Sequence, residues 1–151
     1  MTVSMVPITV SERNEFLRMA VKHFSEVNPA FVPQDDWKEH YFETIMANRL
    51  YFLRWILCDG RRAGFILFGL EKHRFLPRMT GNIYEFHVLP EFRRRGLAKA
   101  CATDAIRELW VHSPSKIQLE VIEGRLAAAA LWRSLGFQKV TDRYVLPRNI
   151  S

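Results

Sequence analysis

Residues 88–98 read VLPEFRRRGLA, and this stretch leads from a strand pattern through a basic turn into a helix. Pro90 ends the apolar strand pattern of residues 81–88, and helix-forming residues continue over residues 97–111. An anion at the start of such a helix gains hydrogen bonds from the first N–H groups and a favourable interaction with the helix dipole. Gly96 lets the main chain approach that anion closely. The stretch predicts a phosphate-binding turn; the alternative is a solvated basic turn before a surface helix.

Two other phosphate-binding motifs are missing from the sequence. It contains neither G-x-x-x-x-G-K-[S/T] nor G-x-G-x-x-G, so neither a P-loop NTPase nor a dinucleotide-binding domain is supported. No linker or repeat divides the 151 residues, and we expect a single domain over residues 1–151. The apolar stretches are far shorter than the ~20 residues that cross a bilayer, and no basic amino-terminal segment leads into an apolar run. We therefore expect a cytoplasmic protein without a membrane span.

The net charge favours an anionic partner. The chain has 22 Lys and Arg residues against 16 Asp and Glu residues, a formal net charge of +6. Nucleic acid is one such partner. Nucleic-acid-binding proteins usually spread basic residues along a face and interleave them with aromatic residues, whereas the densest basic cluster here is a single turn. The pattern therefore disfavours nucleic acid.

The cysteines and histidines give no sign of a metal site. Cys58 and Cys101 fall in an apolar strand and on an apolar helix face, which is typical of buried free thiols. The five histidines lack the spacing of metal ligands. We expect no metal, no disulfide and no cysteine nucleophile.

The remaining segments predict alternating strands and helices. Asp59-Gly60 is a strong hairpin signal, and Gly136 has the place of the residue that follows a helix. The predicted order is β-α-α-β-β-β-α-β-α-β. The first half has a strand at 5–10, a helix capped by Ser11, a helix capped by Asp35 or Asp36, and strands at 50–58, 62–70 and 82–88. The second half has a helix at 97–111, a strand at 116–122, a helix at 126–135 and a strand from Phe137 to Leu146.

Two segments resemble motifs of the GNAT superfamily of N-acetyltransferases. Arg93-x-x-Gly96-x-Ala98, between a strand and a helix, resembles the Arg/Gln-x-x-Gly-x-Gly/Ala loop that binds the pyrophosphate of acetyl-CoA. Residues 126–137, LAAAALWRSLGF, are similar to the family's Asn-x-x-Ala-x-x-Leu-Tyr-x-x-x-Gly-Phe segment. The resemblance implies an α/β fold of the α+β type, a mixed and mostly antiparallel sheet flanked by helices. It also implies acetyl transfer from acetyl-CoA to a primary amine of a small molecule or protein.

The resemblance further implies where acetyl-CoA binds. The pantetheine arm would lie in the gap between the strand ending at Val88 and the strand at 116–122, paired with the main chain of residues 86–88. The pyrophosphate would bind the amides of residues 94–99. The implied cofactor-binding residues are Phe86, His87, Val88, Arg93, Arg94, Arg95, Gly96, Leu97, Ala98, Lys99, Arg125, Ala128 and Trp132.

Acetylation of an amine calls for a general base. An alkyl amine with a pKa of roughly 10.4 is protonated at neutral pH and must lose its proton before it attacks. Glu85 lies on the central strand, close to where several family members have an acidic residue, and we expect it to be the base, directly or through water. The alternative is a surface glutamate that pairs with a basic neighbour. Strand alternation places Glu85 on one face with Ile83 and His87, and Tyr84, Phe86 and Val88 on the other, unless a bulge changes the register.

Two positions depart from the family pattern. Trp132 stands where many members have a tyrosine that protonates the departing thiolate, and an indole has no acidic proton, so the ring contacts the thioester or packs in the core. Tyr84 and Tyr144 are alternative donors, although a thiol with a pKa of roughly 8.5 is a tolerable leaving group without one. Arg125 occupies the asparagine position, where we expect it to reach a CoA phosphate.

The acceptor-binding region has no sharp motif. We expect its walls from residues 28–41, residues 73–79 and the final strands. Four acidic residues either attract a cationic amine or form a solvated helix face: Asp35, Asp36, Glu39 and Glu43. Three aromatic residues either line a pocket or fill the core: Phe31, Trp37 and Tyr41.

Three functions follow from these patterns. The first, our prediction, is an acetyl-CoA-dependent N-acetyltransferase, in which the acceptor amine attacks the thioester directly. The second is an acyl-CoA sensor without turnover, and the third is a basic nucleic-acid-binding domain. The sequence leaves open whether the protein forms a homodimer.

Overall fold

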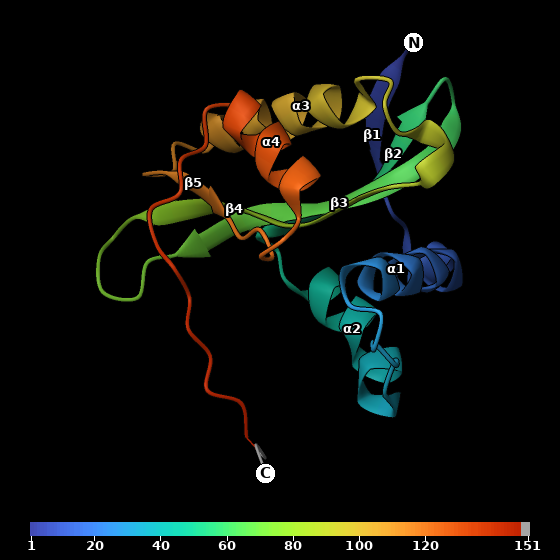
Figure 1. Cartoon of the computed structure of the whole chain (residues 1–151), viewed down its shortest axis with the longest axis horizontal. Helices are drawn as coiled ribbons and strands as arrows, with labels where there is room; N and C mark the ends of the chain where they lie inside the picture. Colours follow the sequence, from blue (N-terminus) through green and yellow to red (C-terminus); the bar gives the residue numbers. More distant parts are fainter. Residues whose placement is uncertain (149–151) are drawn as a thin grey trace.

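The computed structural model describes residues 1–148, and a five-stranded sheet forms its centre (Figure 1). The strands lie in chain order; β1 to β4 are antiparallel neighbours, and β4 and β5 are parallel. The elements are β1 (Val3–Pro7), α1 (Arg13–Val27), α2 (Asp35–Ala47), β2 (Tyr51–Cys58), β3 (Arg61–Lys72), β4 (Met79–Val88), α3 (Leu97–Val111), β5 (Ile117–Leu119) and α4 (Leu126–Ser134). The predicted mixed, mostly antiparallel sheet flanked by helices is confirmed.

The sheet separates two apolar cores. Figure 1 shows α3 and α4 on one face of the sheet and α1 and α2 on the other. The core under α3 and α4 includes Ile66, Phe68, Ile83, Leu109 and Trp132. The core under α1 and α2 includes Phe16, Phe42, Leu53, Trp55 and Phe65. Burial of apolar side chains on both faces therefore fixes the central strands.

The strongest local signals form as predicted. Asp59 and Gly60 have φ angles of 51° and 80°, as a tight hairpin between antiparallel strands requires. Helix α3 has the predicted bounds, and Gly136, with a φ of 98°, follows α4. These features depend on neighbouring residues, so the sequence specifies them well.

The predicted helix caps are wrong. The first strand ends earlier than predicted because Thr9 belongs to a short 3-10 turn, in which its N–H donates to Glu12 Oε1 at 2.9 Å. Helix α1 follows this turn, so Ser11 is not its cap. Gln34 is the N-cap of α2, while Asp35 and Asp36 lie in its first turn, where their negative charges interact favourably with the helix dipole.

The final strand is also absent from the described residues. Residues 137–146 form no strand, and Val140, Tyr144 and Leu146 are about nine-tenths exposed. The predicted strand at 116–122 shortens to β5, of only three residues. An alternating pattern forms a strand only where a neighbouring strand accepts its hydrogen bonds, and β5 offers almost no edge.

A bulge in β4 changes the predicted faces. Leu67 pairs with Glu85 and the next residue, Phe68, pairs with Ile83, so Tyr84 is an extra residue in β4. Ile83 packs under α3 and α4, while Tyr84 packs in the opposite core. The prediction that Ile83 shares a face with Glu85 is therefore wrong, because the bulge brings Tyr84 and Glu85 to one side.

Among residues 1–148, no helix is both long and apolar enough to cross a membrane.

Candidate active site

The sheet opens beside the second half of β4. Strand β5 pairs with β4 only between residues 81–83 and 117–119. Beyond Ile83, no strand among the described residues lies on this side of β4. The edge of β4 at residues 84–87 therefore has no partner strand, and an extended ligand can add to it as a strand does.

The basic turn at the end of this strand has the geometry of an anion site. Arg94 and Gly96 have positive φ angles of 64° and 77°, and Gly96 directly precedes α3. Within the described chain, the amides of residues 94–99 donate no hydrogen bond to another backbone group, and no side chain caps the helix. A Cβ atom on Gly96 would meet nothing within 4 Å, so the approach is open. This geometry agrees with the predicted phosphate-binding turn.

Arg93 lies in a contact that the sequence did not indicate. Its Nε donates to the carbonyl of Val88 at 2.8 Å, and its guanidinium pairs with Glu26 of α1 at 2.6 and 2.7 Å. The hydrogen bond from Arg93 lowers the pKa of Glu26. Arg125 Nη1 donates to the carbonyl of Glu26 at 3.4 Å. The Arg93 side chain therefore ties the turn to α1, whereas Arg94 and Arg95 are exposed beside the free amides.

Glu85 contacts a histidine that the sequence reasoning missed. Glu85 Oε2 lies 2.6 Å from Nε2 of His23, whose side chain is 8% exposed against 28% for that of Glu85. His23 shares the buried face of α1 with Phe16 and Ala20. A histidine at apolar helical spacing was the signal that could have found it, but only the tertiary structure shows which carboxylate it meets.

His87 is a weaker candidate for the base than Glu85. Burial, and then the nearby His23, lower the pKa of His87 to about 4, so the ring is neutral at physiological pH. It is 3% exposed, and its Nε2 has no hydrogen-bond partner among the described residues. The His23 and His87 rings lie 5.3 Å apart. His87 therefore lies next to the Glu85–His23 pair without access to solvent.

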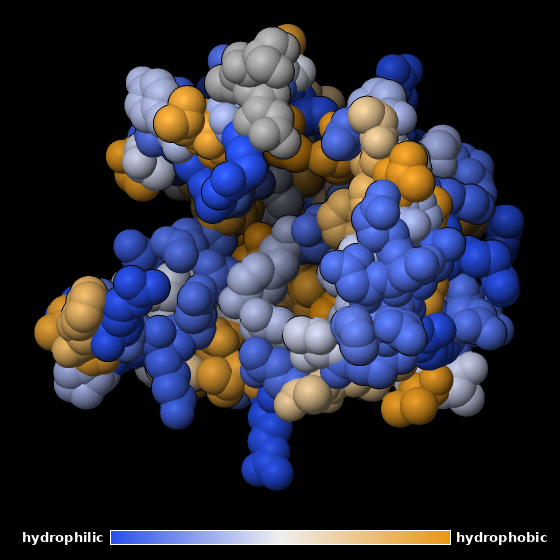
Figure 2. Space-filling model, turned by 90° about the horizontal axis from the view of Figure 1, so that it is seen from below, coloured by the Kyte–Doolittle hydropathy of each residue, from blue (hydrophilic) through white to orange (hydrophobic). Residues whose placement is uncertain are grey.

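A pocket of about 470 Å³ opens in front of Glu85. Its lining comes from α2 and from β2, β3 and β4. Figure 2 shows the molecule from the side of α1 and α2, where hydrophilic side chains lie around patches of apolar ones. The rings of Trp37 and Tyr41 are stacked, with their centroids 5.0 Å apart. The rings of Tyr51 and Tyr84 have the same centroid distance but are tilted by 55° to each other. The lining residues are Asp36, Trp37, His40, Tyr41, Thr44, Ile45, Tyr51, Leu67, Tyr84 and Glu85.

The structure divides the residues expected around the acceptor. Asp36 lines the pocket, whereas Glu43 pairs with Arg13 at 2.5 Å, and Asp35 and Glu39 are exposed on α2. Phe31 lies outside the lining and packs against Trp37 at 5.5 Å. Only part of the predicted acidic face therefore reaches the acceptor region.

The tyrosines differ in their access to this pocket. Burial raises the pKa of Tyr41 and of Tyr84 above the ordinary range, with the charge of Glu85 also acting on Tyr41, so both hydroxyls stay protonated. Tyr84 lines the pocket, whereas Tyr144 is 91% exposed on the segment after α4. Of the two predicted proton donors, the structure brings only Tyr84 close to Glu85.

Trp132 lies behind β4, in the other core. It is 8% exposed, and its ring packs edge-on against Phe86 at 5.7 Å and Phe137 at 5.6 Å. Ala128 packs against the same core. The core position is one of the two predicted for Trp132, and it places no acidic hydroxyl at the position that is tyrosine in many family members.

The thiols and the metal-ligand residue types add no second chemistry to this region. Cys58 and Cys101 are buried and free, and burial raises the pKa of Cys101 to about 12, so its thiol is not a nucleophile. No group of three His, Cys, Asp or Glu side chains in the described part of the chain has the arrangement of a metal site.

Fold and site together are those of an acyltransferase, which moves an acyl group from a donor to an amine. The model of the acetyltransferase (GNAT) family matches residues 17–137, and the chain belongs to this family of N-acetyltransferases. The predicted family and enzyme class are confirmed, and the family uses acetyl-CoA.

Known relatives agree with this assignment. The chain is 32% identical over 107 residues to the [ribosomal protein bS18]-alanine N-acetyltransferase of Salmonella typhimurium (strain LT2), across 71% of this chain and 68% of that protein. The crystal structure of ribosomal-protein-alanine N-acetyltransferase from Brucella melitensis biovar Abortus 2308 matches with a TM-score of 0.76 at 18% identity, over 97% of this chain and 99% of that one. Aminoglycoside 6'-N-acetyltransferase AAC(6')-IG from Acinetobacter haemolyticus also matches with a TM-score of 0.76, at 15% identity over 98% and 99%. The two structures share the fold.

Proposed function

We propose that this N-acetyltransferase moves the acetyl group of acetyl-CoA directly to the α-amino group of a polypeptide, with Glu85 as the general base. The position of Glu85 carries the proposal. Its carboxylate contacts buried His23 and lines the 470 Å³ pocket, on the part of β4 that pairs with β3 along one edge and with no described strand along the other. An amine in this pocket would meet both a proton acceptor and the open edge of the sheet.

The donor would lie along that open edge. The free amides of residues 94–99 suit a pyrophosphate, and the backbone of residues 86–88 suits the extended pantetheine arm. Arg125, which directly precedes α4, contacts the carbonyl of Glu26, and the Glu26 carboxylate pairs with Arg93 of the turn; from there Arg125 would reach a phosphate of CoA. Most of the rate enhancement then comes from holding thioester and amine together, with a backbone amide near Val88 polarising the carbonyl.

Glu85 would act on the protonated amine. An α-amino group has a pKa of roughly 7.7 to 8.0 and is mostly charged at neutral pH, so a carboxylate beside it can remove one proton and leave the neutral nitrogen free to attack the thioester carbon. The Nε2–H of His23 would hold the Glu85 carboxylate in one orientation. Attack forms the C–N bond and a tetrahedral intermediate, whose nitrogen then loses a second proton to solvent. The C–S bond breaks as the intermediate collapses, and CoA leaves as the thiolate.

The leaving thiolate needs no dedicated acid in this proposal. Trp132 has no acidic proton, and a thiol with a pKa of roughly 8.5 is a tolerable leaving group. The protonated hydroxyl of Tyr84 lies on the pocket side of β4 and is the nearest alternative donor of the two predicted. Tyr144, the other candidate, is exposed on the segment after α4.

The relatives support a polypeptide acceptor. Both alanine N-acetyltransferases are named for ribosomal-protein substrates, and one of them is the 32% identical relative. A cytoplasmic location and a homodimer stay predictions from the sequence. The acetylation of an aminoglycoside is a second candidate, favoured by the structural similarity to AAC(6')-IG.

An amine panel tests the proposed function. We expect thiol release from acetyl-CoA with peptides that have a free amino terminus, and little release with amino-terminally blocked peptides that keep a lysine or with an aminoglycoside. Mass spectrometry then assigns the added acetyl group to the α-amine. The proposal is contradicted if the aminoglycoside is the sole amine that is acetylated, or if none of the amines in the panel is acetylated.

Substitution of His23 tests its contact with Glu85. The His23→Leu variant loses the donor, and we expect kcat to fall about tenfold, as for loss of a hydrogen bond to a charged group. KM for acetyl-CoA and for the acceptor should change little, because His23 contacts Glu85 and neither substrate in this proposal. The matched variant His23→Gln keeps an N–H donor and should restore much of kcat. An unchanged kcat in His23→Leu, or equal losses in the two variants, shows a purely structural contact.

A further inference from the structure

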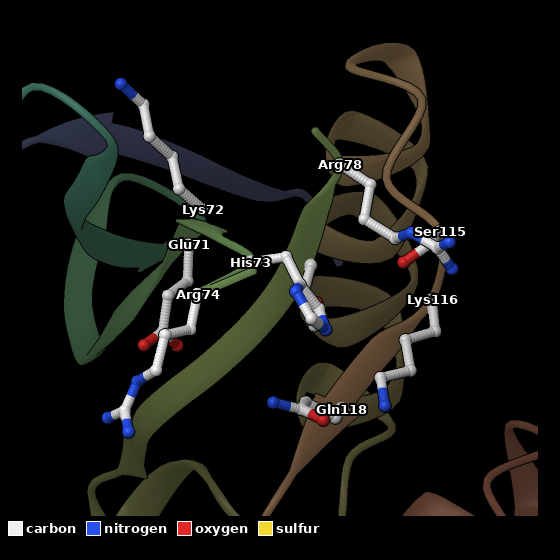
Figure 3. A pocket seen from close by; sticks show the side chains of 9 residues that line it. Glu71, Lys72, His73, Arg74, Arg78, Ser115, Lys116 and Gln118 are labelled. Atoms are coloured by element: carbon white, nitrogen blue, oxygen red, sulfur yellow. The ribbon is translucent and has the colours of Figure 1, made fainter. Parts of the chain in front are cut away.

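A second hollow lies at the other end of β4, beside the hairpin that joins β3 and β4 (Figure 3). It has a volume of about 430 Å³. Basic side chains predominate in its lining, which consists of Glu71, Lys72, His73, Arg74, Arg78, Thr80, Ser115, Lys116 and Gln118. In Figure 3, His73, Lys116 and Gln118 point toward a shared space, and Lys72 and Arg74 extend on the other side. We call this set of residues the basic hollow.

The cations of the basic hollow are not neutralised by the protein. In the part of the chain that the structure describes, no carboxylate lies within ion-pair distance of Lys72, Arg74, Arg78 or Lys116. Glu71, the one acid in the lining, accepts from Asn82 Nδ2 at 3.4 Å. A concave surface with one sign of charge concentrates the positive potential and attracts anionic groups.

His73 gives the basic hollow a fixed donor. Its Nδ1 accepts hydrogen bonds from the backbone N–H groups of Phe75 and Leu76, both at 3.0 Å. Because Nδ1 accepts, the ring proton is on Nε2, which remains available to a ligand. Gln118 is held in turn, since its Nε2 donates to Oδ1 of buried Asn82 at 3.0 Å. The polar floor of the hollow is therefore ordered before a ligand binds.

The basic hollow and the acceptor pocket lie at successive positions along β4. Thr80 lines the hollow, Tyr84 and Glu85 line the pocket, and Asn82 lies between them. The pKa of Tyr84 is raised first by burial, then by Tyr51 and by the charge of Glu71, so Glu71 lies near both regions. Thr80 and Glu85 are five residues apart, roughly 16 Å along a strand, which about five extended residues of an acceptor would span.

We propose that the basic hollow binds an acidic side chain of the acceptor polypeptide, about four to six residues after the amino terminus that Glu85 deprotonates. This inference rests on the proposed function and adds a specificity determinant to it. A carboxylate there would meet unpaired cations and the Nε2–H of His73. A polycationic acceptor would instead be repelled, which favours a polypeptide over an aminoglycoside.

Paired peptides test the subsite. Two peptides share a free amino terminus and the same sequence except at positions four to six. One peptide has Asp and Glu at these positions, and the other has Asn and Gln. With the wild-type enzyme we expect KM for the acidic peptide to be about tenfold lower at similar kcat, since exposed charge pairs contribute modestly. The Arg78→Glu/Lys116→Glu variant should remove or reverse this preference. The control variant Arg107→Glu also reverses a positive charge, at an exposed side chain of α3 that lies away from the hollow, and should keep the preference.

The controls separate the subsite from folding and from the proposed function. The neutral variant Arg78→Gln/Lys116→Gln should lose the preference without adding repulsion, and circular dichroism should show that it folds. Equal KM values for both peptides in the wild-type enzyme, or loss of preference in Arg107→Glu, contradict the subsite. Tight RNA binding that the double variant loses would also contradict it. If neither peptide is acetylated, the proposed function fails, and calorimetric binding of the two peptides still decides on the hollow.

Discussion

Replacing Glu85 with glutamine is expected to lower kcat by about 10² to 10⁴-fold at neutral pH, the range typical for the loss of a general base. Glutamine has nearly the same shape and keeps an oxygen that can accept from His23, but it cannot take a proton. The KM for acetyl-CoA should change little, because the proposed donor contacts are made by the main chain of residues 86–88 and 94–99. Steady-state thiol release from acetyl-CoA measures both quantities.

The pH dependence of this variant separates proton removal from positioning. Above a pH of about 8, an α-amine is mostly neutral and no longer needs a base, so the deficit of Glu85→Gln should shrink as the pH rises. A matched control is Glu39→Gln on exposed α2, whose side chain is 75% exposed outside the pocket lining. This control should keep wild-type kcat. Full turnover of Glu85→Gln across the pH profile would transfer the role to Tyr84 or His87.

Replacing Gly96 with glutamate is expected to weaken acetyl-CoA binding by about 30-fold to 100-fold. The free turn of the variant relaxes away from the φ of 77°, so binding must restore this conformation at about 1 to 2 kcal/mol. A carboxylate beside the free amides of α3 also competes with the pyrophosphate and repels it. Together these effects amount to roughly 2 to 3 kcal/mol. Isothermal titration calorimetry with acetyl-CoA measures the change.

Two further variants divide this effect into strain and charge. Gly96→Ala adds the backbone strain without a charge and should weaken binding only a few fold. Gly60→Glu is a matched control because Gly60 has a φ of 80° and equally open surroundings, but lies at the hairpin between β2 and β3. It should cost stability and leave acetyl-CoA affinity close to wild type. Unchanged affinity in Gly96→Glu would show that the pyrophosphate does not bind this turn.

The sequence predicted those parts of the fold that depend on adjacent residues. The bounds of α3, the hairpin at Asp59-Gly60 and the glycine after α4 follow from backbone preferences that act within a few residues. The two GNAT-like segments were readable for the same reason, since each is a local backbone arrangement. The predicted strand at 137–146 failed because a strand exists only with a partner, and no alternating pattern reveals whether one is present.

The candidate site shows the same division. The sequence by itself determined the family, the donor and the position of Glu85 on the strand that precedes the phosphate-binding turn. Only the tertiary structure decided that a bulge at Tyr84 turns Glu85 into the aromatic pocket, that His23 from α1 contacts it, and that Glu26 takes up the side chain of Arg93. These contacts join residues more than 60 positions apart, and packing across the sheet, rather than any local preference, brings them together.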